Sequence, residues 1–180
     1  KFLRRIGDAP VIYSEEEALR SEEEITKAVH NMGYMAATVK RSTKIKKKKI
    51  KLYYDVTAGN PYVVRSIKYD VPDPKIASIL KRDSARNLLK EGMYFDVNVL
   101  DADRQRITDR LLRNGYYKFN KDFIGYTADT ARNTYNVDLI QHLQPYKVHA
   151  SDSARAHQQY RINKINFITD YDVLQSSAMS

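Results

Sequence analysis

The chain has 180 residues, of which 42% are hydrophobic and 29% charged, and its formal net charge is +9. This composition is typical of a globular protein, and no run of roughly 20 apolar residues is present that could span a bilayer as a helix. Because cysteine is absent, a disulfide scaffold and a thiolate zinc site are both excluded.

The first predicted elements are helical. Residues 1–7 are expected to close a helix, and the chain opens in mid-pattern without an initiator Met, as an excised fragment of a longer protein would. Two capping boxes follow, Ser14 with Glu17 and Ser21 with Glu24. The second leads directly into an apolar stripe at helical spacing, so it is the stronger signal for a helix start.

Alternating apolar and polar residues then predict two strands, Met35–Arg41 and Ile50–Val56, joined across a lysine-rich turn. A turn at Gly59-Asn60-Pro61 ends the second strand, and Tyr62–Tyr69 begins another. The turn carries a basic patch of six lysines. They are Lys44, Lys46, Lys47, Lys48, Lys49 and Lys51. The favoured interpretation is a solvated hairpin whose lysines discourage edge-to-edge aggregation, and the alternative is a site for phosphates of nucleic acid or lipid head groups.

The second half repeats this order. Asp73 before Pro74 predicts a helix start, a short helix is expected at 85–90, and Asp96 or Asn98 caps a long helix. Its charged residues are expected to face water. They are Asp101, Asp103, Arg104, Arg106, Asp109 and Arg110. A strand from Tyr116 to Ile124 changes phase, which a bulge or a break between Asn120 and Asp122 would explain. Its return strand contains Tyr135, Val137 and Leu139.

Two internal echoes indicate a tandem repeat. Gly33-Tyr34 and Gly115-Tyr116 each close a helix, and Tyr62–Tyr69 returns as Tyr160–Phe167. We therefore assign residues 1–59 to a first module that lacks its opening strand and residues 60–145 to a second. Residues 146–158 form a polar linker, and residues 159–180 are expected to hold the opening strand of a truncated third module.

No reaction centre is found in the sequence. The four histidines lack the paired spacing of metal ligands, and no phosphate loop, nucleophile elbow or dinucleotide fingerprint is present. We therefore expect no catalytic residue, no metal site, no cofactor and no enzymatic activity.

In this order, the motifs resemble tandem POTRA domains, the periplasmic modules of outer-membrane assembly proteins of the BamA/TamA type. The resemblance rests on the helix-ending Gly-Tyr pairs and on Val-x-x-Gly-x-Pro-Tyr-x-Val-x-x-Ile-x-Tyr at Val56–Tyr69. Leu3–Pro10 and Thr127–Thr130 look closest to versions from Bacteroides-like bacteria. The implied fold class is α+β, with β-α-α-β-β modules that each have a three-stranded sheet and two helices on one face. A departure is the second joint, where Leu143–Tyr146 is followed by a long insert.

The resemblance implies a periplasmic scaffold of an outer-membrane β-barrel assembly or translocation protein, attached to the membrane through a C-terminal barrel outside this sequence. Its partners would be unfolded outer-membrane proteins and accessory lipoproteins, bound by strand addition to an open sheet edge. We expect these edges in the strands after each Gly-Tyr pair. The residues are Met35, Ala36, Thr38, Lys40 and Arg41, and Tyr116, Lys118, Asn120, Asp122 and Ile124. The lysine-rich turn would face an anionic membrane surface or an acidic partner.

The competing interpretation is a basic nucleic-acid-binding protein. It is motivated by the net charge and by Tyr53 and Tyr54 beside the lysines, since stacking aromatics and cations suit single strands. It predicts binding that weakens steeply with salt. The scatter of tyrosines over both modules disfavours it.

Overall fold

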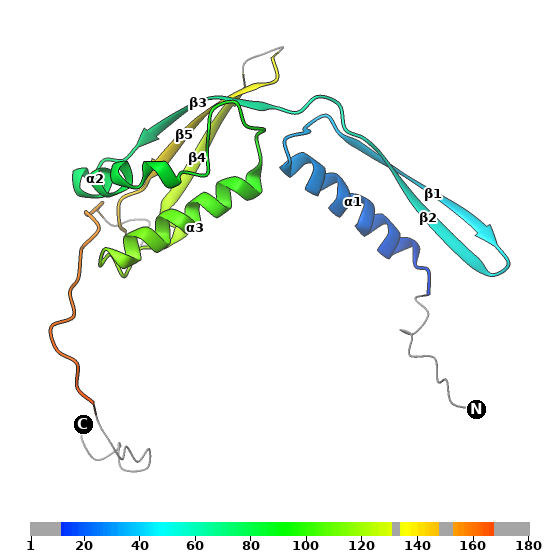
Figure 1. Cartoon of the computed structure of the whole chain (residues 1–180). Helices are drawn as coiled ribbons and strands as arrows, with labels where there is room; N and C mark the ends of the chain where they lie inside the picture. Colours follow the sequence, from blue (N-terminus) through cyan, green and yellow to red (C-terminus); the bar gives the residue numbers. More distant parts are fainter. Residues whose placement is uncertain (1–11, 131–133, 148–152, 168–180) are drawn as a thin grey trace.

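The computed structural model describes residues 12–130, 134–147 and 153–167. A helix and a two-stranded hairpin form the first module, and a three-stranded sheet with helices on one side forms the second (Figure 1). The predicted α+β class is therefore confirmed, and the second module has the predicted order strand, helix, helix, strand, strand.

Helix α1 (Glu15–Asn31) begins at Ser14, whose hydroxyl accepts a hydrogen bond from the Glu17 amide at 3.4 Å. The expectation that Ser21 starts the helix is wrong, because Ser21 lies inside α1 and donates to the Glu17 carbonyl at 2.8 Å. The additional residues 15–21 make about two helical turns, in which Ala18 is buried. A capping pattern alone does not reveal such burial, so it did not distinguish the two starts.

Strands β1 (Thr38–Lys46) and β2 (Lys49–Thr57) form an antiparallel hairpin. Both strands include lysines of the basic patch, so only two residues, Lys47 and Lys48, form the turn. One face of the hairpin packs on α1, where the Tyr54 hydroxyl donates to a carbonyl of the helix at 2.9 Å. The other face is turned away from α1.

In the second module, β3 (Val63–Asp70), β5 (Asn136–Leu143) and β4 (Ile124–Thr130) form a sheet in the order β3-β5-β4. Strand β3 is parallel to β5, and β4 is antiparallel to β5. The connection between the parallel strands contains α2 (Pro74–Arg82) and α3 (Val97–Arg113), because parallel neighbours need a long crossover. The last strand in sequence is therefore central, and β4 lies at an edge.

The core lies between the helices and one face of this sheet. Side chains of β5 alternate between half-buried and buried along the whole strand, and the buried ones include Val137, Leu139 and Leu143. They pack against α2 and α3 through Ile76, Ile79, Leu100, Ile107 and Leu111. Both helices thus cover the same face, and the opposite face of the sheet is open (Figure 1).

The predicted helix starts of the second module are confirmed. The Asp73 carboxylate accepts the Lys75 amide at 2.8 Å, and Asp96 accepts the Asn98 amide at 2.7 Å. Each aspartate thereby satisfies a donor that the helix leaves unpaired. The short helix expected at 85–90 is instead a single 3-10 turn, Ser84–Arg86.

The two Gly-Tyr pairs end their helices in the same way. Gly33 and Gly115 have φ of +92° and +88°, which favours glycine because it has no Cβ. In both pairs the glycine amide bonds three residues back and the tyrosine amide bonds five residues back, which is the Schellman arrangement. The repeated motif therefore has the same backbone conformation in both modules.

The carbonyl of each glycine also accepts a hydrogen bond from the segment that follows its module. The Gly33 carbonyl accepts the Tyr62 amide at 3.0 Å, and the Gly115 carbonyl accepts the Tyr160 amide at 2.7 Å. The linker folds back before this second joint, because His157 is only 8% exposed and its Nε2 lies 2.8 Å from the Gln144 carbonyl oxygen. Residues 160–167 form no strand with the described part of the chain, so a third module from residue 159 stays a prediction.

Candidate partner-binding edges

Strand β4 is hydrogen-bonded on one side only among the described residues, to β5. Just before β4, the Gln144 amide donates to the Phe123 carbonyl at 2.8 Å, which sets the alternation of the antiparallel ladder. By that alternation, the backbone groups of Tyr126, Ala128 and Thr130 point to the unpaired side. The outer edge of β4 therefore presents a row of backbone donors and acceptors.

The opposite edge of the sheet is partly covered. The segment that precedes α3 lies along the start of β3, where Tyr94 bridges to Val63 and the Val64 amide donates to the Met93 carbonyl at 2.8 Å. The Phe95 amide also donates to the Tyr62 carbonyl at 2.8 Å. An incoming strand would have to displace these contacts, so β4 is the more accessible edge of the second module.

A buried polar cluster holds β4 against α3. Asp103 of α3, which is 1% exposed, accepts hydrogen bonds from Arg106 Nε at 2.8 Å and from the Leu88 amide at 3.1 Å. The Tyr126 hydroxyl of β4 lies 3.4 Å from the same carboxylate and accepts a bond from Gln141 at 2.9 Å. Burial, reinforced by the Asp103 charge, raises the pKa of Tyr126, so this hydroxyl keeps its proton.

The expectation that Asp103 and Arg106 face water is therefore wrong. Arg106 bridges two acids, since its NH1 group also lies 2.7 Å from an oxygen of the buried Asp83. Its NH2 group donates to Asn87 at 2.9 Å. Helical spacing predicted exposure because these residues share a helix face with solvent-facing neighbours. The segment between α2 and α3 covers them through contacts that helical spacing does not reveal. The cluster joins both helices and β4, which keeps the edge strand in place.

The predicted edge strand of the second module begins too early. Tyr116, Lys118, Asn120 and Asp122 precede β4, and of the five predicted residues Ile124 alone lies in it, where its side chain is buried. The Phe119 amide bonds the Tyr116 carbonyl at 2.9 Å, which makes a turn, and both of these rings are buried. The interruption expected at 120–122 is present as a 3-10 helix, Lys121–Phe123.

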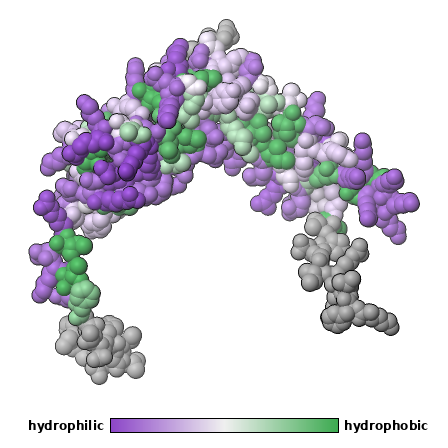
Figure 2. All heavy atoms as spheres, in the orientation of Figure 1, coloured by the Kyte–Doolittle hydropathy of each residue, from purple (hydrophilic) through white to green (hydrophobic). Residues whose placement is uncertain are grey.

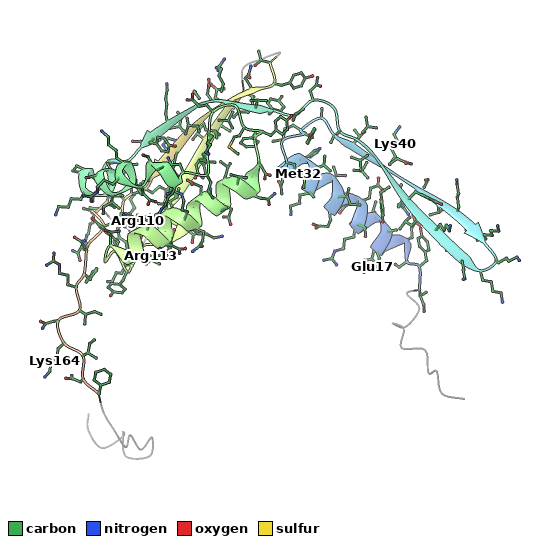
Figure 3. The ribbon with its side chains drawn as sticks, in the orientation of Figure 1. Glu17, Met32, Lys40, Arg110, Arg113 and Lys164 are labelled. Carbon is green, nitrogen blue, oxygen red and sulfur yellow. The ribbon has the colours of Figure 1, made fainter. Side chains whose placement is uncertain are left out.

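The predicted edge of the first module is also shifted. Met35 and Ala36 lie in a turn, and the strand begins at Thr38, so only Thr38, Lys40 and Arg41 belong to β1. Lys40 lies on the face turned away from α1 (Figure 3). In both modules a turn follows the Gly-Tyr pair before the strand begins. Alternating hydrophobicity does not distinguish such a turn from the first residues of a strand.

Arg41 has a structural role that the sequence did not indicate. Its guanidinium lies 2.5 Å from Glu15 and 3.3 Å from Glu22 of α1, so it ties β1 to the helix. The bond from Arg41, and next to it the Tyr13 hydroxyl, lowers the pKa of Glu15 to about 2. This arginine is therefore already engaged and is a poor candidate for partner contact.

This tie predicts a pH effect on the first module. A folded-state pKa below the unfolded value of 4.5 means that the Glu15 contribution is present above that value and disappears as the pH falls toward 2. Glu15→Gln is expected to lower the melting temperature slightly at neutral pH, since the carboxylate is 69% exposed and screened by solvent. Thermal unfolding across pH should show this gap closing in acid. A gap that persists unchanged at pH 2, or that Glu16→Gln reproduces, would contradict the assignment.

Two polar groups bridge strands on the open face of the sheet. His142 Nδ1 lies 3.1 Å from Asp70 and its Nε2 lies 2.9 Å from the Thr127 hydroxyl, linking all three strands. Arg65 pairs with Asp138, and this bond is the main cause of the lowered pKa of Asp138. We assign these groups to strand cohesion.

The described residues contain no cluster of metal ligands, since no group of three or more histidine, cysteine, aspartate or glutamate side chains among them is placed to hold a metal ion. None of the described helices has both the length and the apolarity needed to cross a bilayer.

Comparison with known proteins was made against family models and solved structures. The POTRA family model, described as a surface antigen variable number repeat, matches residues 8–59 and 70–140. Among solved structures, BamA from Haemophilus ducreyi lacking POTRA domains 1–3 is 21% identical, with a TM-score of 0.42 over 74% of this chain and 24% of that chain.

Two further structures are similar. POTRA3–5 of BamA from Haemophilus influenzae is 18% identical, with a TM-score of 0.39 over 73% of this chain and 48% of that one. POTRA1–3 of the periplasmic domain of Omp85 from Anabaena is 16% identical, with a TM-score of 0.32 over 76% of this chain and 60% of that one. The present chain thus spans less than two thirds of each of these three structures.

Proposed function

This chain belongs to the POTRA family, and from that premise we propose that it is a periplasmic scaffold of an outer-membrane β-barrel assembly or translocation protein. In this proposal it binds unfolded outer-membrane proteins by strand addition at the outer edge of β4. The remainder of the protein would supply the barrel, and accessory lipoproteins would be further partners. The proposed site is β4 itself, in place of the residues predicted ahead of it, which do not lie on a strand.

The proposal rests on the outer edge of β4, which pairs with no strand among the described residues. This strand contains neither lysine, arginine nor proline, and its one charged residue is Asp129. Natural edge strands are usually protected by such cations, by proline or by a covering loop. An edge without these features can accept an extended peptide through main-chain hydrogen bonds, which require little of the client's sequence.

The hairpin of the first module is less suited to this role. Strand β1 carries Lys40, Arg41, Lys44 and Lys46 along its length. Lysines on an edge strand oppose the approach of another strand. A client would therefore be expected to pair with β4 in preference to β1.

Side chains of the client would meet two different surfaces. Residues on one face of the added strand would continue the open face of the sheet beside Thr127, which is exposed. Residues on the other face would lie toward α3, where the Arg104 guanidinium stacks on the Tyr126 ring at 5.4 Å. Since strand side chains alternate between faces, a barrel strand with alternating apolar and polar residues would fit both surfaces.

The test substitutes the backbone donor at the centre of the edge. Ala128→Pro removes an outward amide, and Ala128→Val keeps it, while neither change affects an amide that bonds β5. Binding of a peptide with the sequence of an outer-membrane barrel strand is expected to weaken by about tenfold in the proline variant, through a lost hydrogen bond and steric obstruction. The valine variant should bind like the unaltered protein.

Fluorescence anisotropy with a labelled peptide would measure this effect, and amide spectra would check that both variants retain the fold. Thr130→Pro provides a second edge variant if Ala128→Pro disturbs the sheet. Equal binding by the proline and valine variants, with the fold retained, would overturn β4 as the client site.

A further inference from the structure

The end of the β1–β2 hairpin carries more positive charge than edge protection requires. Residues 40–51 contain seven lysines and no aspartate or glutamate. Lys44 lies directly opposite Lys51, and Lys46 lies directly opposite Lys49. Like charges at opposed positions destabilise a hairpin. Both strands of this two-stranded sheet have an outer edge that lysines could guard, but edge protection does not require the lysines to be directly opposed.

The turn itself is also unfavourable for lysine. Lys47 and Lys48 have φ of +47° and +62°, a conformation in which two-residue hairpin turns usually hold asparagine and glycine. At both positions the chain has a cation instead. None of the seven lysines forms an ion pair with a described residue. The charge of the hairpin end is therefore available to an external partner.

A second feature distinguishes this hairpin end from a purely basic patch. Ile45 and Ile50 are opposed across the two strands and are 74% and 39% exposed. They lie on the same face as Tyr54, opposite the face of Lys44 and Lys51, because side chains alternate along each strand. Figure 2 shows hydrophobic colour among the hydrophilic residues at this end of the molecule.

We infer that the end of the β1–β2 hairpin, Lys44–Lys51, binds an anionic membrane surface through lipid phosphates, with Ile45 and Ile50 entering the head-group region. Because the isoleucines lie on one face of the hairpin and these lysine pairs on the other, the hairpin would meet the membrane with its turn first. Lysine can then bury its methylene groups while its ammonium reaches the phosphates. Each lysine near an anionic bilayer adds to the attraction. This contact is separate from client binding at β4 and would orient the first module toward the membrane.

The isoleucines favour a bilayer over nucleic acid. Single-stranded nucleic acid is bound by aromatic side chains that stack on bases, together with cations. On the lysine-bearing face the described hairpin offers one such ring, Tyr53, which Lys44 already covers at 5.4 Å. A pair of exposed isoleucines contributes little to a phosphate polymer. It contributes directly to insertion between head groups.

The experiment is sedimentation with vesicles of phosphatidylglycerol and phosphatidylcholine, compared with vesicles of phosphatidylcholine alone. We expect binding to the anionic vesicles only, weakened by salt. Lys46→Gln with Lys49→Gln should reduce the affinity roughly 25-fold, at about fivefold per lysine. Ile45→Ser with Ile50→Ser should reduce it by about tenfold through lost apolar burial. Lys75→Gln with Lys81→Gln, two exposed lysines of α2, should change nothing.

No binding to the anionic vesicles would overturn the inference. Loss of binding in the lysine variant alone, with the isoleucine variant unaffected and single-stranded RNA bound equally well, would assign the hairpin to nucleic acid instead. Barrel-strand peptide binding should be unchanged in all three double variants. Vesicle binding should likewise survive Ala128→Pro, so the two sites can fail independently.

Discussion

Asp103→Ala is expected to lower the free energy of unfolding of the second module by about 2 to 3 kcal/mol, because the Leu88 amide and the Arg106 guanidinium each lose an acceptor. The carboxylate is 1% exposed and accepts bonds from Arg106, from the Leu88 amide and from Tyr126. In the variant, the Arg106 guanidinium would keep Asp83 as its only acid, and the Leu88 amide would lose its acceptor. Urea unfolding followed by circular dichroism would measure the loss.

A matched control lies on the same helix. The Asp101 side chain is half-exposed and pairs with the half-exposed Lys121 at 3.2 Å, so Asp101→Ala should cost less than about 1 kcal/mol, as solvent-screened ion pairs do. Asp103→Asn keeps an acceptor without the charge and should fall between the two variants. A cost for Asp103→Ala no larger than that for Asp101→Ala would show that the buried cluster does not hold α2, α3 and β4 together.

Gly33→Ala is expected to disrupt the joint between the two modules. The glycine has φ of +92°, and a Cβ at this position would lie 2.4 Å from the Phe95 carbonyl oxygen of the second module. Because that oxygen belongs to the backbone, the contact can be relieved only by moving one module away from the other. The bond from the Tyr62 amide to the Gly33 carbonyl would then also be strained.

The effect can be separated from ordinary glycine strain. Gly92 has a similar φ of +84°, but a Cβ there would meet open space, so Gly92→Ala carries only the backbone cost of about 1 kcal/mol. Spin labels attached to cysteines introduced by Lys27→Cys and Lys75→Cys would report the distance between modules. Labelling would be specific to these two positions because the chain has no other cysteine. We expect a broadened or shifted distribution for Gly33→Ala and an unchanged one for Gly92→Ala. Identical distributions in both variants would contradict a joint locked by Gly33.

Local signals in the sequence predicted much of the fold. Asp73 and Asp96 start α2 and α3 because a carboxylate satisfies the first free amides, and this chemistry needs only neighbouring residues. Gly33 and Gly115 end their helices because only glycine adopts the required φ without strain. The predicted relation to POTRA domains rested on the order of these signals and is confirmed by the family match.

Contacts between distant segments account for the errors. Tyr116 and Phe119 are buried by tertiary packing although the backbone makes a turn between them. Aromatic residues in this segment were therefore mistaken for the alternating pattern of a strand. Asp103 looked like a solvent-facing charge because its partners at Leu88 and Tyr126 lie 15 and 23 residues away. The free edge of β4 was likewise hidden, since it depends on the strand order β3-β5-β4. The sequence predicted open sheet edges, and the strand order shows that β4 is an edge strand of the second module.

In the proposed function, clients join the sheet at β4. The most direct measurement is the mapping of amide chemical shifts and amide exchange in an isotopically labelled chain titrated with an unfolded outer-membrane barrel segment. We predict that the outward amides of Tyr126, Ala128 and Thr130 shift and become protected from exchange, with smaller changes in β1. Changes concentrated in the β1–β2 hairpin, with the amides of β4 unaffected, would contradict it.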